Sequence, residues 1–238
     1  MKNKSVKSLV AVDVFGNYSE YSVEEMLALR LNNWKDWDCS AGYNSLHITS
    51  DGNIFKATCK VDGYLGNVFD TGVVFPQHWA KCDKEWCMCG SDMQLPKSRS
   101  GKFDSVELKV KVPDLKFFET VDLAPHCKID NSIKTITWDI GRRCNFHCAY
   151  CPPSTSNDYE SHKTWNSLQQ AADLLILGFC RGKRGRWIFT GGEPTINPNF
   201  MTLAKYLSEE FRHGVFTQTN GSRPKEYLIE LLRYSSIG

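Results

Sequence analysis

Hydrophobic and polar positions follow two different patterns along the chain, and the pattern changes near residue 130. Before that point the residues alternate as in half-buried strands at 8–16, 43–61 and 105–112, and Asp51-Gly52 in the middle stretch is a strong hairpin signal. Ser22 and Glu25 have capping-box spacing, so we expect a helix there with Met26, Leu27, Leu31 and Trp34 on its apolar face. We therefore predict a smaller α+β domain with antiparallel strands over residues 1–130.

After residue 130 the chain alternates between short apolar strands and helical segments. Strands are expected at 134–141, 186–190 and 214–219, and helices at 167–180, 199–211 and 225–234. Successive strand–loop–helix units form a parallel sheet through right-handed crossovers. The expected core positions of the first helix share one face: Leu168, Ala171, Ala172, Leu175 and Ile176. Residues 131–238 are thus predicted to be an α/β domain with about three βα units and a parallel sheet.

Composition and charge exclude several classes of protein. The chain has 238 residues, 41% of them hydrophobic and 24% charged, with a net charge of +2, which is ordinary for a globular protein. The N-terminus is a poor secretory signal and the longest apolar run is too short to cross a bilayer. We expect a cytoplasmic protein without a membrane partner.

Ten cysteines are many for a chain in a reducing compartment, where clustered thiols indicate metal or redox chemistry rather than disulfides. Cys127 and Cys180 stand alone and are expected to be small buried side chains. The segment "CNFHCAYC" places Cys144, Cys148 and Cys151 just after the first parallel strand, at the rim where α/β sheets bind ligands. With His147 as fourth ligand these thiols would suit zinc. Alternatively, they would hold a [4Fe–4S] cluster and leave one iron open to a substrate or cofactor.

"CNFHCAYC" resembles the signature of the radical S-adenosylmethionine (SAM) superfamily, C-x3-C-x-aromatic-C, with Tyr150 at the aromatic position. The second strand ends in "FTGGEP", which is similar to the methionine-binding motif of that family, and the third ends in "TQTNG", similar to a stretch at the same rim. The resemblance implies a partial (βα) barrel and an enzyme that reductively cleaves SAM. The resulting 5′-deoxyadenosyl radical abstracts hydrogen from a substrate.

The resemblance also implies roles for individual residues. Cys144, Cys148 and Cys151 would hold the cluster, and Tyr150 would place its backbone near the adenine. The motif residues Gly191, Gly192, Glu193 and Pro194 would bind the methionine part of SAM. The glycines would allow close approach of the backbone, Glu193 would orient the amino group, and Pro194 would fix the exit from the turn. Thr219 and Asn220 would line the ribose or substrate side, with a simple strand-end turn as the alternative.

A second group of cysteines lies near the hairpin: Cys39, Cys59, Cys82, Cys87 and Cys89. This region resembles the SPASM and twitch extensions of radical SAM enzymes, which bind auxiliary iron–sulfur clusters, although here it precedes the catalytic domain. We expect one auxiliary site that uses four of the five thiols, with Cys39, Cys59, Cys87 and Cys89 as the first choice. Its metal would be a second [4Fe–4S] cluster or zinc.

Three strands are fewer than the six of a complete radical SAM barrel and leave an open edge beside the third. The chain is therefore expected to be a fragment, to be completed by a second chain, or to cover that edge itself. SAM and an electron donor such as flavodoxin or ferredoxin are the implied partners.

The substrate implied by the SPASM-like region is a peptide or protein, with a nucleoside or other small metabolite as the alternative. An alternative to an active enzyme is a partner subunit that has no activity of its own. A non-catalytic zinc module is a further alternative, in which the basic segment "RGKRGR" (181–186) and Trp187 would contact nucleic acid.

Overall fold

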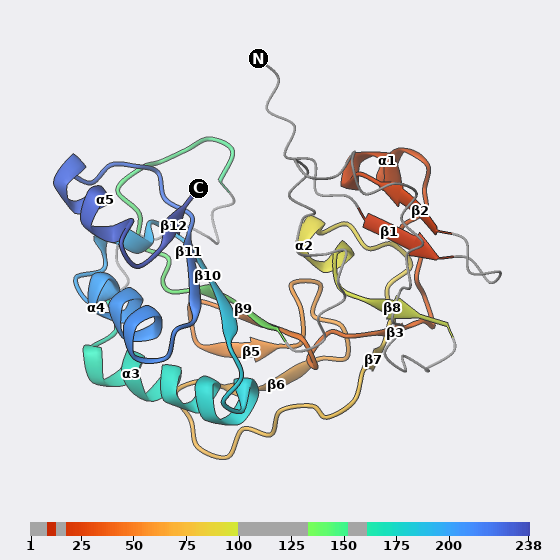
Figure 1. Cartoon of the computed structure of the whole chain (residues 1–238), viewed down its shortest axis with the longest axis horizontal. Coiled ribbons are helices and arrows are strands. Elements are labelled where there is room, and N and C mark those ends of the chain that lie inside the picture. The colour runs from red at the N-terminus through yellow and green to blue at the C-terminus, as the bar shows by residue number, and fades with distance from the viewer. Residues whose placement is uncertain (1–8, 13–17, 100–132, 152–160) are drawn as a thin grey trace, which may run out of the picture. The chain divides into compact units, whose positions relative to one another are not determined.

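The computed structural model describes residues 9–12, 18–99, 133–151 and 161–238 (Figure 1). The chain divides into two compact units, each of which is formed by two separate segments. We call residues 40–80 with 131–238 the sheet unit, and residues 1–39 with 81–130 the cysteine-rich unit.

The sheet unit is built on one sheet of seven strands in the order β12-β11-β10-β9-β4-β5-β6. Strands β9 to β12 run parallel to one another and β4 runs parallel to β9, whereas β5 and β6 are antiparallel. An α/β architecture with a mostly parallel sheet is therefore confirmed. The strands are β4 (Ser45–Ile48), β5 (Asn53–Phe55), β6 (Tyr64–Asn67), β9 (Lys134–Asp139), β10 (Gly185–Thr190), β11 (Gly214–Thr217) and β12 (Ser236–Ile237).

Helices follow β9, β10 and β11 and cover one face of the sheet, as Figure 1 shows. Thr164 caps the first helix by accepting a hydrogen bond from the Ser167 amide. The expected apolar face of this helix is confirmed, since all five of its residues are buried. The helical segments are α3 (Trp165–Leu174), which continues as a π-helix η3 (Leu175–Cys180), the 3₁₀-helix η4 (Pro194–Ile196), α4 (Phe200–Lys205), which continues as a π-helix η5 (Tyr206–Glu210), and α5 (Lys225–Leu231).

The two faces of the sheet differ because successive strand residues point to opposite sides. On β9, Ile136 and Trp138 are buried under the helices with Trp187 and Phe189 of β10. The alternate residues, such as Asp139, are only half-buried. The helix-covered face thus forms the core, and the other face carries the polar positions.

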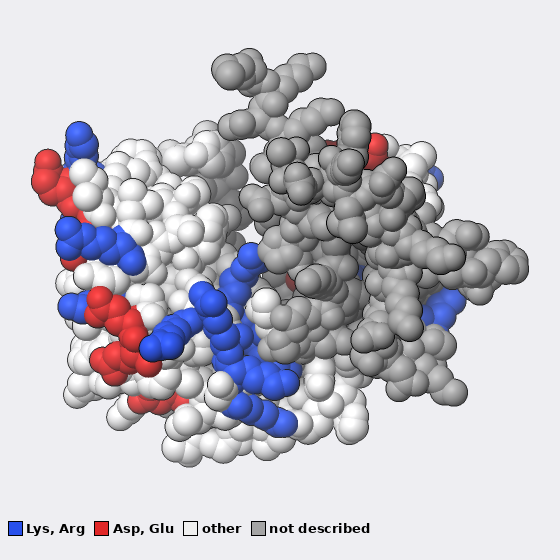
Figure 2. Space-filling view, in the orientation of Figure 1, with Lys and Arg blue, Asp and Glu red and all other residues white. Residues whose placement is uncertain are grey.

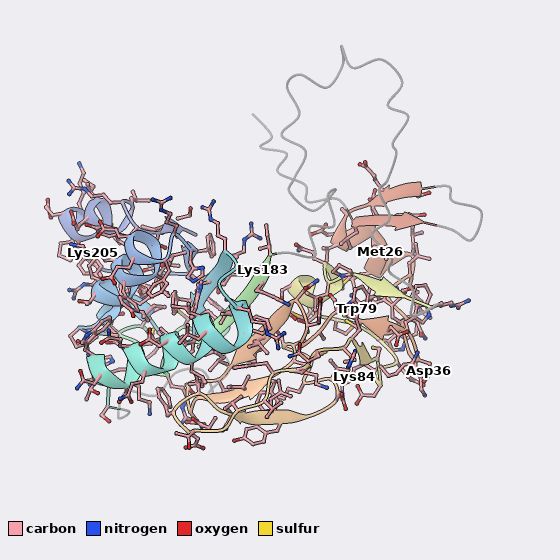
Figure 3. All side chains as sticks on the ribbon, turned by 60° about the horizontal axis from the view of Figure 1, so that its bottom comes forward. Met26, Asp36, Trp79, Lys84, Lys183 and Lys205 are labelled. Atoms are coloured by element: carbon pink, nitrogen blue, oxygen red, sulfur yellow. The ribbon has the colours of Figure 1, made fainter. Side chains whose placement is uncertain are left out.

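The cysteine-rich unit has few regular elements and a small core of Met26, Trp34, Cys87 and Met93 among its described residues. The capping box is confirmed: Ser22 Oγ accepts from the Glu25 amide, and the Glu25 carboxylate accepts from the Ser22 amide. The capping box begins a short helix whose buried residue, Met26, is labelled in Figure 3. The elements are β1 (Leu9–Val12) antiparallel to β2 (Tyr18–Tyr21), α1 (Val23–Ala28), α2 (Gly90–Met93), and a sheet of β7 (Ala80–Lys81), β3 (Asp38–Cys39) and β8 (Lys97–Ser98).

The boundary between the units differs from the one expected near residue 130. The hairpin at Asp51-Gly52 forms as expected, but its first strand β4 pairs in parallel with β9, so residues 40–80 belong to the sheet unit. Alternation along the hairpin indicates that it has one buried face, but it carries no information about which sheet that face joins.

Other expectations need smaller corrections. The third parallel strand is not the edge, because β12 pairs with it. Helix α1 ends at Ala28, so Leu31 and Trp34 lie beyond it. The strand expected at 105–112 and Cys127 lie outside the described residues. None of the helices in the described part of the chain is long and apolar enough to cross a bilayer.

Candidate functional site

The cysteine loop begins directly after β9, at the carboxyl end of the sheet's central parallel strands. Cys144 and Cys148 are half-buried and Cys151 is exposed. A turn in which the Cys151 amide donates to the Cys148 carbonyl (3.0 Å) holds the second and third cysteines together. Desolvation, followed by the neighbouring Cys148 and Cys144 thiols, raises the pKa of Cys151.

Thiols that are gathered on one accessible loop suit a metal or an iron–sulfur cluster. Among the residues that the structure describes, no three His, Cys, Asp or Glu side chains already surround a common point. Cluster binding therefore requires the side chains of this loop to turn towards one another, which their exposure permits.

The glycine motif follows β10 and packs against the backbone of the cysteine loop. Gly191 has a φ of +112°, and a Cβ there would lie 2.4 Å from the Gly141 carbonyl oxygen. A Cβ on Gly192 would lie 2.2 Å from the Arg143 carbonyl oxygen. Only glycine fits at these two positions, since the neighbouring atoms are backbone. The sequence predicts glycines for approach to a ligand, and the structure shows that they are also required for contact between two loops.

Backbone hydrogen bonds fix that contact. The Gly192 amide donates to the Gly141 carbonyl (2.8 Å), and the Glu193 amide donates to the Arg143 carbonyl (2.9 Å). Pro194 begins the short helix η4, which fits its expected role at the exit from the turn. The glycine motif therefore determines the path of the chain immediately before Cys144.

Glu193 connects this motif to the loop after β11. The residue is only 3% exposed. Its Oε1 accepts from the Thr195 amide (3.0 Å), the Thr195 hydroxyl (2.6 Å) and the Thr219 hydroxyl (2.8 Å). Its Oε2 accepts from the Asn220 amide (2.6 Å). The carboxylate thus joins the second and third strand ends.

Asn220 in turn reaches the cysteine loop. Its Nδ2 lies 3.1 Å from the Asn145 Oδ1 and 3.8 Å from the Cys144 Sγ. The three sequence motifs, which are separated by many residues, are therefore in hydrogen-bond contact at one rim of the sheet. Tyr150 is different: it is 86% exposed, and a hydrogen bond with the Cys148 side chain raises the pKa of its phenol.

A pocket of about 520 Å³ lies beside the first cysteine. Its walls include two histidines, of which the sequence analysis considered His147 only as a zinc ligand and missed His162. Position along the chain was the available signal, since His147 lies within the cysteine segment and His162 follows it. The lining residues are Arg143, Cys144, Asn145, His147, His162 and Ile196.

A pair of a buried histidine and a half-buried aspartate next to this rim was also missed. His47 on β4 places its Nε2 3.6 Å from the Asp139 Oδ2 at the end of β9. Burial raises the pKa of Asp139, and His47 opposes that effect. His47 Nδ1 has no hydrogen-bond partner among the described residues. Sequence alone did not reveal the pair because β4 was not expected in this sheet.

The second group of cysteines is divided between the units. Cys39, Cys82, Cys87 and Cys89 belong to the cysteine-rich unit, whereas Cys59 belongs to the sheet unit. Cys39, Cys82 and Cys87 are buried. Burial raises the pKa of Cys87 to about 12, with further upward contributions from Asp92, Cys39 and Cys82 and a downward one from Lys97. These three thiols are therefore close neighbours.

The basic segment 181–186 does not form a single loop. Arg181 has a left-handed φ of 52° at the end of η3, and Gly185 and Arg186 already belong to β10. Lys183, labelled in Figure 3, lies in the turn between them. On the face shown in Figure 2, acidic and basic side chains are interspersed at the left of the view, whereas Lys and Arg side chains gather without acidic ones in the middle.

A parallel α/β sheet with a three-cysteine loop and a glycine motif at its carboxyl rim defines the class of site, and comparison with known proteins agrees. Residues 138–237 match the family model described as the Radical SAM superfamily. The predicted resemblance to the radical SAM superfamily is therefore confirmed for this part of the chain, whereas an extension of the SPASM or twitch type is not.

The matches to individual relatives cover only part of the length of each protein. The chain is similar to 7-carboxy-7-deazaguanine synthase of Methanothermobacter thermautotrophicus, with 30% identity over 124 residues, 48% of each protein. It is also similar to GTP 3',8-cyclase of Nautilia profundicola, with 30% identity over 106 residues, 44% of this chain and 33% of the relative. The corresponding cyclase of Moorella thermoacetica is 35% identical over 66 residues, 28% of this chain and 20% of the relative. The chain thus spans about half or less of the length of these relatives. No solved structure matches it significantly.

Proposed function

We propose that this chain is a radical SAM enzyme, or the cluster-bearing part of one, which cleaves SAM reductively at a [4Fe–4S] cluster. The observation that carries the proposal is the meeting of the three motifs at one rim, where Glu193 and Asn220 connect the glycine motif and the third strand end to Cys144. A chance three-cysteine spacing does not require this convergence.

Different residues are proposed to bind the cluster, the methionine part of SAM, and its adenine and ribose. Cys144, Cys148 and Cys151 are the proposed cluster ligands, since thiolates are the usual ligands of such clusters. When bound, the cluster supplies the electron for cleavage. The backbone of Gly191 and Gly192 provides a surface without side chains for the methionine part of SAM. Tyr150 is the proposed neighbour of the adenine through its backbone, and Thr219 and Asn220 line the ribose or substrate side.

For the substrate, the relatives favour a nucleoside, nucleotide or similar small metabolite over the peptide that the SPASM-like region implies. Two of the matching names, GTP 3',8-cyclase and 7-carboxy-7-deazaguanine synthase, refer to guanine compounds. The pocket beside Cys144 contains Arg143, His147 and His162, whose side chains match the anionic and hydrogen-bonding groups of such compounds. An electron donor such as flavodoxin or ferredoxin is the proposed protein partner, and a second chain that continues the sheet beyond β12 is a further one.

The test is anaerobic reconstitution with iron and sulfide, followed by reduction in the presence of SAM. Wild-type protein should bind iron and release 5′-deoxyadenosine, and Cys148→Ala should do neither. His147→Ala is the matched control in the same loop: it should keep its iron if three thiolates suffice, and lose the metal if the site is zinc with a histidine ligand. Iron-free wild-type protein after reconstitution would contradict the proposal.

We further propose an auxiliary site in the cysteine-rich unit, with a second [4Fe–4S] cluster or zinc as its metal. The burial and proximity of Cys39, Cys82 and Cys87 support it, and Cys89 is the fourth ligand in the same unit. This set replaces Cys59, which belongs to the other unit, with Cys82. Metal analysis of a variant with Cys144, Cys148 and Cys151 all changed to alanine tests it: metal should remain, and its loss would contradict the site.

A further inference from the structure

Both oxygens of the Glu193 carboxylate already accept hydrogen bonds from the protein. Four donors reach its two oxygens at 2.6–3.0 Å, and Glu193 is only 3% exposed. Among the described residues no lysine or arginine forms an ion pair with it. Four donors match an ionised carboxylate, which only accepts. Oε1 already accepts three of these bonds, so a ligand ammonium group could reach only Oε2, which also holds the Asn220 amide.

We propose that Glu193 is a positioning residue that acts on the cluster through Asn220, and not a ligand of the SAM amino group through its carboxylate. The inference rests on the proposed function, because it concerns the cluster that Cys144 would hold. It assigns the acidic residue of the glycine motif to the loop after β11 rather than to the cofactor.

The geometry gives the direction of the effect. Glu193 Oε2 holds the Asn220 backbone at 2.6 Å, and Oε1 holds the Thr219 hydroxyl at 2.8 Å. With its backbone fixed on both sides, Asn220 directs its Nδ2 towards the Cys144 Sγ, 3.8 Å away. The same amide nitrogen donates to Asn145 Oδ1 at 3.1 Å, which holds its plane against the cysteine loop.

An N–H group that points at a cysteine sulfur stabilises the more negative, reduced form of an iron–sulfur cluster, and so raises its reduction potential. Removal of the donor should therefore make the cluster harder to reduce. Loss of Glu193, which holds Asn220 in place, should also lower the reduction potential, because it weakens the same bond from Asn220 to the Cys144 sulfur.

The measurement is a redox titration of the reconstituted, SAM-free protein, followed by the EPR signal of the reduced cluster. For Asn220→Ala the ratio of reduced to oxidised cluster at a fixed potential should fall about fivefold, the size expected for loss of one ordinary hydrogen bond. Glu193→Gln should give a smaller fall, because its amide group would point an N–H at the Thr195 or the Asn220 backbone amide. The double variant should match Asn220→Ala alone, since the two residues act in series.

The affinity for SAM distinguishes a positioning role of Glu193 from a direct bond between Glu193 and SAM. If Glu193 is a positioning residue, Glu193→Gln should weaken SAM binding by less than about threefold, whereas loss of a direct charge-assisted bond would weaken it about tenfold or more. An unchanged SAM-free potential together with tenfold weaker SAM binding would overturn the proposal. Additive shifts in the double variant would overturn it as well.

Two further variants keep the test decisive. Ser222→Ala is the matched control in the same loop, because Ser222 Oγ has no hydrogen-bond partner among the described residues and its loss should leave the potential unchanged. Thr219→Val removes one donor to Glu193 and serves if Glu193→Gln does not take up a cluster; it should shift the potential in the same direction, and no shift counts against the proposal. A wild-type protein that takes up no cluster would instead refute the proposed function itself.

Discussion

The two units of this chain surround their cysteines in opposite ways. In the sheet unit the folded framework is a large core around Trp138, Trp187 and Phe189, and the three thiols lie on a loop at its edge. In the cysteine-rich unit the described core is small, and Cys87 is itself one of its members. The first arrangement has a scaffold that is independent of metal, whereas the second places its thiols where a metal would contribute to the fold.

The strongest test of this difference is metal removal. Treatment of the metal-loaded protein with a chelator should abolish amide hydrogen-exchange protection in the cysteine-rich unit, for example at the Cys82 and Cys87 amides, which donate to Trp37 and Asn32 carbonyls. Protection of β9 and β10 should remain, because apolar packing holds them. Equal loss of protection in both units would show that they do not differ in this way.

Thiol labelling should give the next largest effect. In metal-free protein at pH 7.5, a maleimide should modify exposed Cys151 at least about 100-fold faster than Cys87, because the reactive form is an accessible thiolate. Burial raises the pKa of Cys87 to about 12, so its thiol stays protonated at this pH. Cys180, fully buried with its pKa raised to about 12, is the internal reference for slow labelling in the sheet unit. Rapid labelling of Cys87 would mean that the small core is open without metal.

Within the sheet unit, the two loops at the rim should tolerate glycine substitutions very differently. Gly192→Ala places a Cβ 2.2 Å from the Arg143 carbonyl oxygen, and we expect a loss of about 1–3 kcal/mol in stability together with loss of cluster uptake. Gly141→Ala is the control, because a Cβ there meets nothing within 4 Å. Urea unfolding and iron content measure both variants, and similar behaviour of the two would contradict the packing of the glycine motif on the cysteine loop.

The smallest effect concerns Asp139 at the edge of the site. Burial raises its pKa above the ordinary 3.8, with His47 opposing the shift. A raised folded-state pKa means that its contribution to stability is present below pH 3.8 and is lost as the pH rises through the folded value. Asp139→Asn should therefore gain stability relative to wild type as the pH rises from 4 to 7. We expect less than about 1 kcal/mol, since the carboxyl is 27% exposed. Hydrogen exchange at β9 amides across that range measures it, and a constant difference would argue against titration of the carboxyl.

Much of the secondary structure was predictable because local patterns carried the information. The alternation in β9 and β10, the apolar face of α3 and the capping box before α1 all depend on residues close together in sequence. The parallel order of the strands follows from chain connectivity and handedness. The rim location of the motifs then follows, because parallel strands end at the same edge.

The failures have a common physical origin. The place of β4 beside β9, the inclusion of Cys59 in the sheet unit and the pair of His47 with Asp139 all depend on which distant segments meet. Local patterning shows that a strand has a buried face but does not show which partner buries it.

By itself, the sequence determined the class of this protein: the spacing of Cys144, Cys148 and Cys151, the glycine motif and the strand–helix order are short-range properties. Only the tertiary structure decided that Glu193 is engaged by four protein donors and that Asn220 reaches the first cysteine. The reason is that a carboxylate accepts from whichever donors the fold brings within hydrogen-bond distance, and two of these four donors come from a different strand end, 26 and 27 residues along the chain.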